Sequence, residues 1–454
     1  MITMKKYCKD VIISDRSLIS RATYNCLADK YSRNDTMKLF SDISGLHVNQ
    51  VHCIYFRYGK RALFWIVEAI IDIVRGEILS GELDLPPIFY REKRDSSSFK
   101  LRRIGIQNVK QQIYDYIAVE AIRPFLKRIG RYQCASIPGR GQIYGIRAIK
   151  RWLKNKHYSY IAKADIKKCY ESIDREKLMR FLELHIKNDS ILWLIRTLIY
   201  TFEQGLSIGS YLSQFLCNLY LSQLYHFIAE KTSKVRKHKR PNKYGKMQST
   251  VRRVHKQLFY MDDLLLIGKS SKDLHKTMKI IIKYAKEKLG LTIKENWVIL
   301  KSNVCVKSED KHFVDMMGFR VYRWRVIIRR NVFKRIRRIY MRVGKRIKIH
   351  KHIPVSSAKR VISYFGQIKE MNSRYFNKKY NVHIILKKSK EVLKDYAKRV
   401  FCRKTETCIL GRRQKKRNNN SIHLSQRKTG SYRNSGEFFR NGNRDNRIIN
   451  AVGV

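Results

Sequence analysis

The stretch LFYMDDLLLIG, residues 258–268, places two adjacent carboxylates, Asp262 and Asp263, between two short apolar segments. This pattern predicts a β-hairpin with both carboxylates at its tip. Aspartate is common in turns, so the pair could be a simple polar turn. Adjacent carboxylates equally suit a divalent cation, because Mg²⁺ prefers hard oxygen ligands and leaves places for substrate phosphates. The hairpin alone leaves both interpretations open.

A third carboxylate, Asp165, favours the metal site. Residues 158–174, YSYIAKADIKKCYESID, predict a strand that ends at Asp165 and a following helix that Asp174 caps. Proteins of the α/β class place ligands at the carboxyl ends of strands. Paired with Asp262, Asp165 would bridge two Mg²⁺ ions that activate a primer 3′-hydroxyl and hold a triphosphate. The alternative is that Asp165 only caps the next helix.

The charge of the chain indicates a polyanionic partner. Its 454 residues carry 98 Lys and Arg against 36 Asp and Glu, a formal net charge of +62, and nucleic acid is the commonest partner of such proteins. Hydrophobic residues make up 44%, which is enough for a sizeable core. We find no apolar stretch long enough for a membrane span, no signal-peptide core and no C-x-x-C pair among nine cysteines. These features favour a cytoplasmic protein with no membrane partner.

Three segments, in order along the chain, resemble the central palm motifs of reverse transcriptases. They are KADIKKCYESID (163–174), GLSIGSYLSQFLCNLYL (205–221) and FYMDD (259–263). Weaker matches flank them: LRRIGIQNVKQQI (101–113) and SIPGRGQ (136–142) resemble fingers blocks, and MMGFRV (316–321) resembles the primer grip. Gln107 stands where the family usually has proline. The resemblance covers about residues 101–340 and implies template-directed DNA synthesis.

The resemblance also implies an α/β (α+β) right-hand polymerase fold with fingers, palm and thumb. We expect an N-terminal helical region (1–84), fingers (85–157), a palm (158–319) with a fingers segment around 187–212 and an exposed basic loop at 231–256, a basic helical thumb (320–402) and a flexible basic extension (403–454). The thumb helices are predicted at 331–347, 356–372 and 387–401 from their apolar periodicity.

Residue roles follow from the same resemblance. Asp165, Asp262 and Asp263, together with Ile166, would hold two Mg²⁺ ions, which Mn²⁺ could replace. Tyr170 would exclude a 2′-hydroxyl sterically, Gln214 would contact the nucleotide, and Lys294 would lie near the leaving pyrophosphate. Arg102 or Arg103 would clamp the triphosphate, because guanidinium suits phosphate. Each of these residues also has a plainer interpretation, such as a core aromatic or a solvated surface residue.

A larger set is expected to contact nucleic acid: Arg140, Gly209, Tyr260, Met261, Gly318, Phe319, Arg337, Arg338, Arg412 and Arg413. Gly205 and Gly209 would let the backbone approach the template–nucleotide pair, and Phe319 could equally be a core residue. Residues 321–454 contain 38 Lys and Arg against 6 Asp and Glu. This excess, which includes GRRQKKR at 411–417, suggests a dedicated grip on a partner RNA. The alternative is a solvated, disordered end.

The type of reverse transcriptase is read from variants of the motifs. We see no H-N-H or zinc-like module, no retron-type V-T-G or N-A-x-x-H, and IGSYLSQ (208–214) differs from the block usual in diversity-generating enzymes. The chain looks most similar to stand-alone bacterial enzymes of the antiphage, abortive-infection type. Its partners would be an RNA template, deoxynucleoside triphosphates and a DNA product. Alternatives are a diversity-generating or mobile-element enzyme, a template-independent DNA polymerase and a catalytically silent RNA-binding scaffold; priming and oligomeric state cannot be read.

Overall fold

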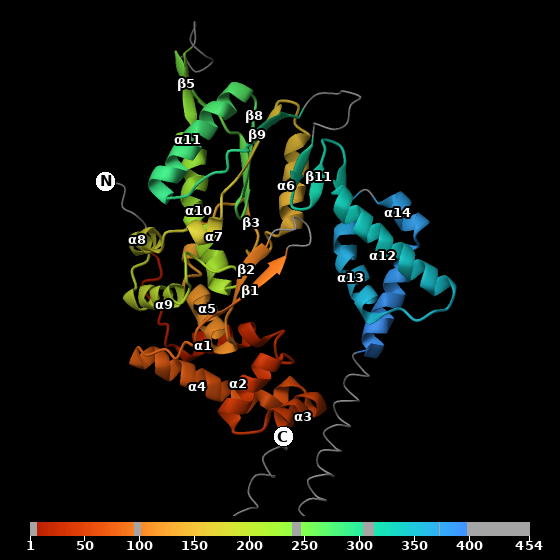
Figure 1. Cartoon of the computed structure of the whole chain (residues 1–454). Coiled ribbons are helices and arrows are strands. Elements are labelled where there is room, and N and C mark those ends of the chain that lie inside the picture. The colour runs from red at the N-terminus through yellow and green to blue at the C-terminus, as the bar shows by residue number, and fades with distance from the viewer. Residues whose placement is uncertain (1–6, 95–100, 238–246, 303–312, 372, 397–454) are drawn as a thin grey trace, which may run out of the picture. The chain divides into compact units, whose positions relative to one another are not determined.

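The computed structural model describes residues 7–94, 101–237, 247–302, 313–371 and 373–396. These residues form a mixed α/β fold in which a five-stranded sheet carries helices on both faces (Figure 1). The predicted extension at 403–454, with Arg412 and Arg413, lies outside the described residues. None of the helices in the described ranges is both long enough and apolar enough to cross a membrane.

The elements are named here in chain order. The helices are α1 (Arg16–Leu27), α2 (Asn34–Ser44), α3 (Val48–Tyr58), η1 (Lys60–Leu63), α4 (Phe64–Ser80), α5 (Val109–Ala121), η2 (Phe125–Arg128), α6 (Gln142–Leu153), α7 (Cys169–Ser172), α8 (Arg175–His185), α9 (Asp189–Tyr200), α10 (Tyr211–Lys231), α11 (Ser271–Leu289), α12 (Arg330–Lys348), α13 (Val355–Ile368) and α14 (Arg374–Lys379). The strands are β1 (Phe89–Arg94), β2 (Leu101–Ile106), β3 (Gln133–Cys134), β4 (Tyr160–Asp165), β5 (Ser233–Lys237), β6 (Gln248–Arg252), β7 (Lys256–Tyr260), β8 (Asp263–Gly268), β9 (Val298–Lys301), β10 (Val314–Met316), β11 (Phe319–Val321) and β12 (Val326–Ile328).

The central sheet has the strand order β3-β7-β8-β4-β9. The strands β7 and β8 form the hairpin predicted from the motif, and β4 pairs antiparallel with β8 over its whole length. The edge strand β3 is parallel to β7, whereas β9 is antiparallel to β4. The segment around Asp165 and the Asp262–Asp263 turn, almost 100 residues apart in sequence, therefore lie on neighbouring strands.

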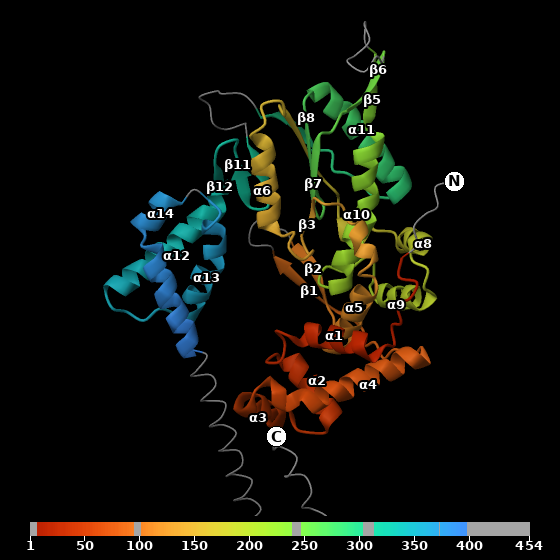
Figure 2. The same cartoon turned by 180° about the vertical axis from the view of Figure 1, so that it is seen from behind.

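The two faces of this sheet belong to different hydrophobic cores, which explains the uninterrupted apolar run in β8. Leu264 and Leu266 pack in one core together with α10 and α11. Leu265 and Ile267 pack in the other core together with α6, β11 and α12. Figure 2 shows α6 on the opposite side of the sheet from α10 and α11. Since successive side chains alternate between faces, a strand covered on both sides is apolar at every position.

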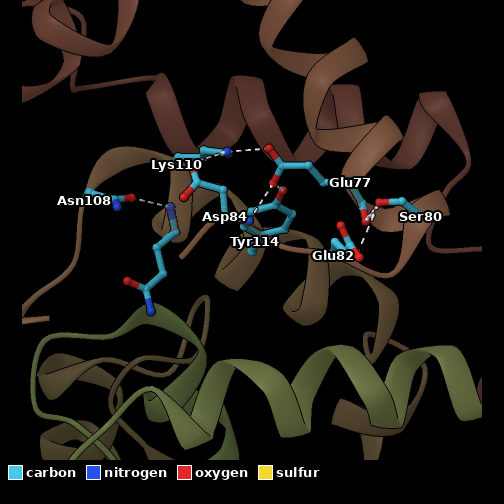
Figure 3. A network of polar contacts seen from close by, with 8 residues as sticks. Glu77, Ser80, Glu82, Asp84, Asn108, Lys110 and Tyr114 are labelled. Carbon is cyan, nitrogen blue, oxygen red and sulfur yellow. Dashed lines mark hydrogen bonds and ion pairs between the residues drawn. The ribbon is translucent and has the colours of Figure 1, made fainter. Parts of the chain in front are cut away.

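The N-terminal helices are joined to α5 by a shielded polar network (Figure 3). Lys110 of α5 forms an ion pair with Glu77 of α4 and a second one with Asp84, at 3.1 Å. The hydroxyl of Tyr114 donates to Glu77 as well. The side chains of Lys110 and Glu77 are only 15% and 18% exposed. Helices α1 and α2 also contact α5 directly, and their buried residues share its core. The N-terminal region is thus part of the same packed unit as the palm helices.

The thumb segment contains one helix more than the sequence predicts. A small antiparallel sheet, β10-β11-β12, leads into α12 and α13, which match two of the predicted helices to within a few residues, except that α13 ends at Ile368. The third helix, predicted at 387–401, begins earlier, at residue 382, and its described part extends to residue 396. The additional helix, α14, has six residues, which is too short for apolar periodicity to reveal it.

The basic stretch 231–256 is not the exposed loop that we predicted. Strands β5 and β6 form a two-stranded antiparallel ribbon within it, with Ser233 opposite Arg252 and Lys237 opposite Gln248. The loop prediction rested on Pro241 and Gly245, which lie outside the described residues, and extended their turn signal too far along the chain. Exposed and half-buried residues alternate along β6, as in a strand with one face covered. Because most of its residues are polar, this alternation cannot be recognised from the sequence.

Two glycines expected to approach nucleic acid are required by contacts within the protein. A Cβ on Gly205, where φ is +52°, would lie 2.5 Å from the carbonyl oxygens of Tyr170 and Glu171. A Cβ on Gly209, where φ is +123°, would lie 2.4 Å from the carbonyl oxygen of Gly105 in β2. The nearest described groups are protein backbone, so the glycines hold the loop before α10 against the motif that follows β4 and against the β1–β2 hairpin. Their expected approach to the template–nucleotide pair stays a prediction.

Gly205→Ala should therefore destabilise the protein by about 3 kcal/mol or more, because left-handed strain is added to a clash with two backbone oxygens that cannot move independently. Gly45→Ala is the matched control. Gly45 also has a left-handed φ, +67°, but a Cβ there meets nothing within 4 Å, so only about 1 kcal/mol should be lost. Urea unfolding measures both. Equal losses in the two variants would show that the loop is not held by this contact.

Candidate active site

The three carboxylates lie together at one edge of the central sheet. Asp165 is the last residue of β4 and is directly opposite Asp263, the first residue of β8. The backbone N–H of Ile166 donates to the carbonyl of Asp262 at 3.0 Å, which ties the turn of the hairpin to the end of β4. No hydrogen bond to the carbonyl of Ile166 is found among the described residues. The arrangement matches the one expected from the spacing of the motifs.

The turn of the hairpin has an unusual backbone that side chains support. Met261 has a φ of +53°, in the left-handed region that a non-glycine residue seldom adopts. Its sulfur accepts from the Tyr170 hydroxyl at 3.7 Å and from Asn218 Nδ2 at 3.4 Å. Asn218, buried in α10, also donates to the carbonyl of Ala135 at 3.3 Å. These contacts hold Met261 inward, so the adjacent carboxylates are fixed at the surface of the turn.

Burial has the largest effect on the ionisation of the three carboxyl groups, and their mutual interactions add to it. Burial raises the pKa of Asp262, and the charge of Asp165 raises it further. Burial and a hydrogen bond with Asp165 raise the pKa of Asp263 to about 7. Burial would also raise the pKa of Asp165, but the hydrogen bond with Asp263 and the nearby Lys294 bring it below its usual value. The hydrogen bond between these two carboxyl groups thus favours the proton on Asp263 and the charge on Asp165.

Two lysines add positive charge to the site. Lys294 lies 3.2 Å from Oδ2 of Asp165, and its N–H donates to the Asp165 carbonyl at 2.9 Å. The charge of Lys163 lowers the pKa of both Asp165 and Asp263 while its amine donates to the carbonyl of Asp315 at 2.9 Å. Lys294, expected near a leaving pyrophosphate, thus contacts a carboxylate of the candidate site. Sequence reasoning missed Lys163, which only the β4 register brings close.

The donor set fits Mg²⁺. In the described part of the chain, no three His, Cys, Asp or Glu side chains already converge closely enough to hold a metal ion. Instead, Asp165 is occupied by Lys294 and by its hydrogen bond with Asp263. Carboxylates that are partly buried side by side are hard oxygen ligands, and a divalent cation would favour their charged forms.

The two candidate arginines differ in their surroundings. Arg103 forms an ion pair with Glu203 at 2.6 Å, and its guanidinium stacks over the ring of Tyr90, 4.5 Å from the centroid. Arg102, its neighbour in β2, points to the other face of the strand. The charge of Arg102 is close enough to lower the pKa of Asp262. Of the two arginines, Arg102 is therefore the one whose charge acts on the candidate site, whereas Arg103 is paired with Glu203.

The proposed nucleotide contacts lie around the same turn. Tyr170 is half-buried, and burial raises the pKa of its hydroxyl far above the usual value. Gln214 is half-buried in the first turn of α10, and its carbonyl accepts from Asn218 at 3.0 Å. Asn218 therefore links the helix of Gln214 to the hairpin turn. A lone amide within the apolar run FLCNLYL was the signal that could have identified Asn218.

Another unpredicted residue, Asp115, orients α10. It is completely buried, with Oδ2 accepting from Ser210 Oγ at 2.7 Å and from the N–H of Leu212 at 3.3 Å. Gln107 donates to Oδ1 at 3.3 Å, so the glutamine that replaces the usual proline belongs to this network. Burial raises the pKa of Asp115 to about 6. A carboxylate on the apolar face of α5 was the sequence signal that could have identified Asp115.

The residues expected to contact nucleic acid are in varied settings. Arg140 donates to the carbonyls of Gly130, at 2.9 Å, and Ile129, so its guanidinium holds its own loop. Gly318 has a φ of +79° in the turn between β10 and β11. Phe319 is 1% exposed, so its side chain packs in the core and supports the hairpin from within.

The remaining members of that set are more accessible. Tyr260 is half-buried beside the carboxylates, whereas Arg337 and Arg338 are exposed on α12. The Nε of Arg337 also donates to the hydroxyl of Tyr380 at 3.1 Å. Unlike Phe319, these residues have exposed side-chain surface that could contact nucleic acid.

Comparison with protein families agrees with this geometry. Residues 92–321, half of the chain, match the family described as reverse transcriptase (RNA-dependent DNA polymerase). The chain therefore belongs to the reverse transcriptase family. The expected fold class, an α/β polymerase fold, is confirmed. A search of curated proteins found no match.

Solved structures similar to the chain include three structures of two telomerases. The telomerase from Candida albicans, in complex with the TWJ fragment of telomeric RNA, is 12% identical, with a TM-score of 0.36 over 67% of this chain. The match spans 60% of the Candida albicans chain. Apo telomerase from Candida tropicalis is 13% identical, with a TM-score of 0.38 over 82% of this chain and 78% of that one. The same telomerase truncated from its C-terminal domain is 15% identical, with a TM-score of 0.36 over 70% and 84%.

The raised pKa of Asp263 predicts a pH-dependent affinity for Mg²⁺. Below pH 7 the carboxyl keeps its proton, which the ion must displace, so the affinity should be about tenfold weaker at pH 6 than at pH 8. Calorimetric titration in two buffers of different ionisation enthalpy measures the affinity and the released proton. Asp263→Asn, which cannot titrate, should weaken binding and remove most of this pH dependence. Identical affinities for the wild-type chain at both pH values would contradict the raised pKa of Asp263.

Proposed function

We propose that the chain is an RNA-directed DNA polymerase that adds deoxynucleotides to a primer 3′-hydroxyl by phosphoryl transfer with two Mg²⁺ ions, or with Mn²⁺ in their place. The observation that carries this proposal is the meeting of Asp165, Asp262 and Asp263 at the ends of neighbouring strands in a member of the reverse transcriptase family. RNA template, deoxynucleoside triphosphates and DNA product would be its partners.

Asp165, Asp262 and Asp263, with the Ile166 carbonyl, are the groups that would hold the ions. Bound Mg²⁺ would lower the pKa of the primer hydroxyl and neutralise charge on the triphosphate. Arg102 would bind triphosphate oxygens from the fingers, since its charge already reaches Asp262. Lys294 would exchange its contact with Asp165 for a phosphate oxygen near the pyrophosphate. Gln214 and the backbone of the Met261 turn would position the base pair and the primer end.

Tyr170 would select deoxynucleotides. Its hydroxyl donates to the Met261 sulfur, and Gly205 lies close to its backbone carbonyl, so both its side chain and its backbone have support. A rigid ring below the sugar excludes a 2′-hydroxyl by steric overlap. These two supports explain why this aromatic is fixed in place.

The biological setting is proposed from the sequence. The form of the IGSYLSQ block and the basic C-terminal residues support an antiphage role in the bacterial cytoplasm, with a dedicated partner RNA as template. The cations of residues 411–417, including Arg412 and Arg413, would bind that RNA through counterion release. RNA binding without any DNA synthesis would instead support a catalytically silent scaffold.

Replacing Asp262 and Asp263 by Ala should lower deoxynucleotide incorporation by roughly a thousandfold or more, because the ions lose most of their ligands. The variant should unfold at the same or a higher temperature at pH 8, since the raised carboxyl pKa values show that the folded state disfavours these charges. Primer extension and thermal unfolding measure the two effects. Asp42→Ala, at an exposed position far from the site in sequence, is the control and should remain active. Retained Mg²⁺-dependent synthesis by the double variant would disprove the assignment.

Tyr170→Ala should admit ribonucleotides while lowering overall efficiency modestly, because the ring that overlaps a 2′-hydroxyl is lost. Tyr170→Phe is the matched control: it keeps the ring but loses the hydroxyl contact with Met261. It should therefore keep its selectivity. Steady-state incorporation of matched ribo- and deoxynucleotides gives the ratio. Unchanged discrimination in the alanine variant would leave Tyr170 as a core aromatic only.

A further inference from the structure

The ribbon formed by β5 and β6 has one supported face and one open face. Lys234 contacts both carboxylate oxygens of Asp273 in α11, at 2.8 and 2.6 Å. Its cross-strand partner Val251 is half-buried, as is Ser249 two residues before it. Because directly opposed residues share a face, these contacts identify the side of the ribbon that rests on the palm.

The open face carries cations and hydrogen-bonding groups but no acid. Its exposed members are Val235, Lys237, Gln248, Thr250 and Arg252, and Ser233, opposite Arg252, is half-buried. Val235 is 63% exposed, which is high for an apolar residue in the middle of a strand. No Asp or Glu occurs anywhere between residues 231 and 256. Among the described residues, this face therefore has two cations with no acid of its own to balance them.

Positive charge also accumulates where the ribbon joins the central sheet. Burial lowers the pKa of His255, and Lys269, Lys256 and Arg252 lower it further, although Asp273 partly opposes them. Asp273 is itself bound by Lys234. An excess of cations held close together in the absence of a partner is the electrostatic footprint of a polyanion site.

This surface is separate from the catalytic carboxylates. A Cβ on Gly268, the last residue of β8, would lie 3.0 Å from the carbonyl of Arg253, which places the base of the ribbon at that end of the hairpin. Asp263 is at the other end of β8, five residues away, or about 17 Å at 3.4 Å per residue. The ribbon therefore does not reach the primer terminus, and what it contacts must extend well beyond the reacting nucleotides.

We propose that the open face of the β5–β6 ribbon binds the phosphate–ribose backbone of an RNA duplex outside the primer–template. This inference rests on the proposed use of an RNA partner. Lys237 and Arg252 would pair with phosphates, and Gln248 and Thr250 would hydrogen-bond ribose 2′-hydroxyls, which DNA lacks. The exposed Val235, in the middle of this face, would pack against a ribose. Through Lys234 and Asp273 the bound RNA would be tied to the palm.

The test uses the full chain with Lys237→Gln and Arg252→Gln together. The probe is an RNA hairpin with a stem of about 20 base pairs, compared with a DNA hairpin of the same sequence. At about 0.1 M salt the double variant should bind the RNA roughly tenfold more weakly, and the log–log salt slope should shrink by about two. The loss should be smaller for DNA. Synthesis on a short annealed primer–template should stay near the wild-type rate.

The charge-matched control is Lys231→Gln with Arg236→Gln, which removes two cations from the same region but leaves the open face intact. It should keep most of the RNA affinity. The proposal is overturned if RNA affinity and salt slope are unchanged, if the control loses as much, or if DNA is affected as strongly as RNA. A change in oligomeric mass with normal RNA binding would assign the face to a protein contact and also overturn it. A chain that makes no DNA yet loses RNA binding through Lys237 and Arg252 would refute the polymerase and retain this site.

Discussion

The close placement of three partly buried carboxylates, Asp165, Asp262 and Asp263, is the constraint on which the rest of the site depends. Three partly buried carboxylates at neighbouring strand ends would separate unless the backbone beneath them were rigid. The rigidity comes from a sheet that is covered on both faces, so that each of its central strands is fixed by two cores. The inward Met261 and the amide of Asn218 then fix the turn itself. Packing thereby holds carboxylates whose burial opposes their charged forms.

Much of this was predictable because it depends on local pattern. The apolar segments around the Asp262–Asp263 pair predicted the hairpin, and the strand ending at Asp165 predicted the third carboxylate, as the structure confirms. Asp174 caps α8 as expected. What the sequence did not reveal depends on register. Choosing between Arg102 and Arg103 requires knowing which face of β2 is turned to the palm, and a motif does not contain that information.

Other features escaped prediction because they arise from contacts between distant segments. Asp115 and Gln107 acquire meaning only when α5 is placed against the start of α10. The ribbon was mistaken for a loop because polar strands exposed on one face lack a clear apolar alternation. Gly205 carried a correct signal for close approach, but the approaching group could be identified only from the fold. The sequence thus indicated which residues have a special local role more readily than it indicated which distant residues contact them.

The position of α5 has a consequence for dividing the protein into parts. This helix contacts α1 and α2 on one side and α9 and α10 on the other, and Lys110 and Tyr114 bind Glu77 across the boundary. If the chain were trimmed at Pro86 and Pro87, where the sequence suggests a border, the apolar side of α5 would be exposed. Lys110 and Tyr114 would also lose Glu77 as their partner. The smallest folded polymerase unit must therefore retain the N-terminal helices, even though the three carboxylates of the candidate site lie beyond them.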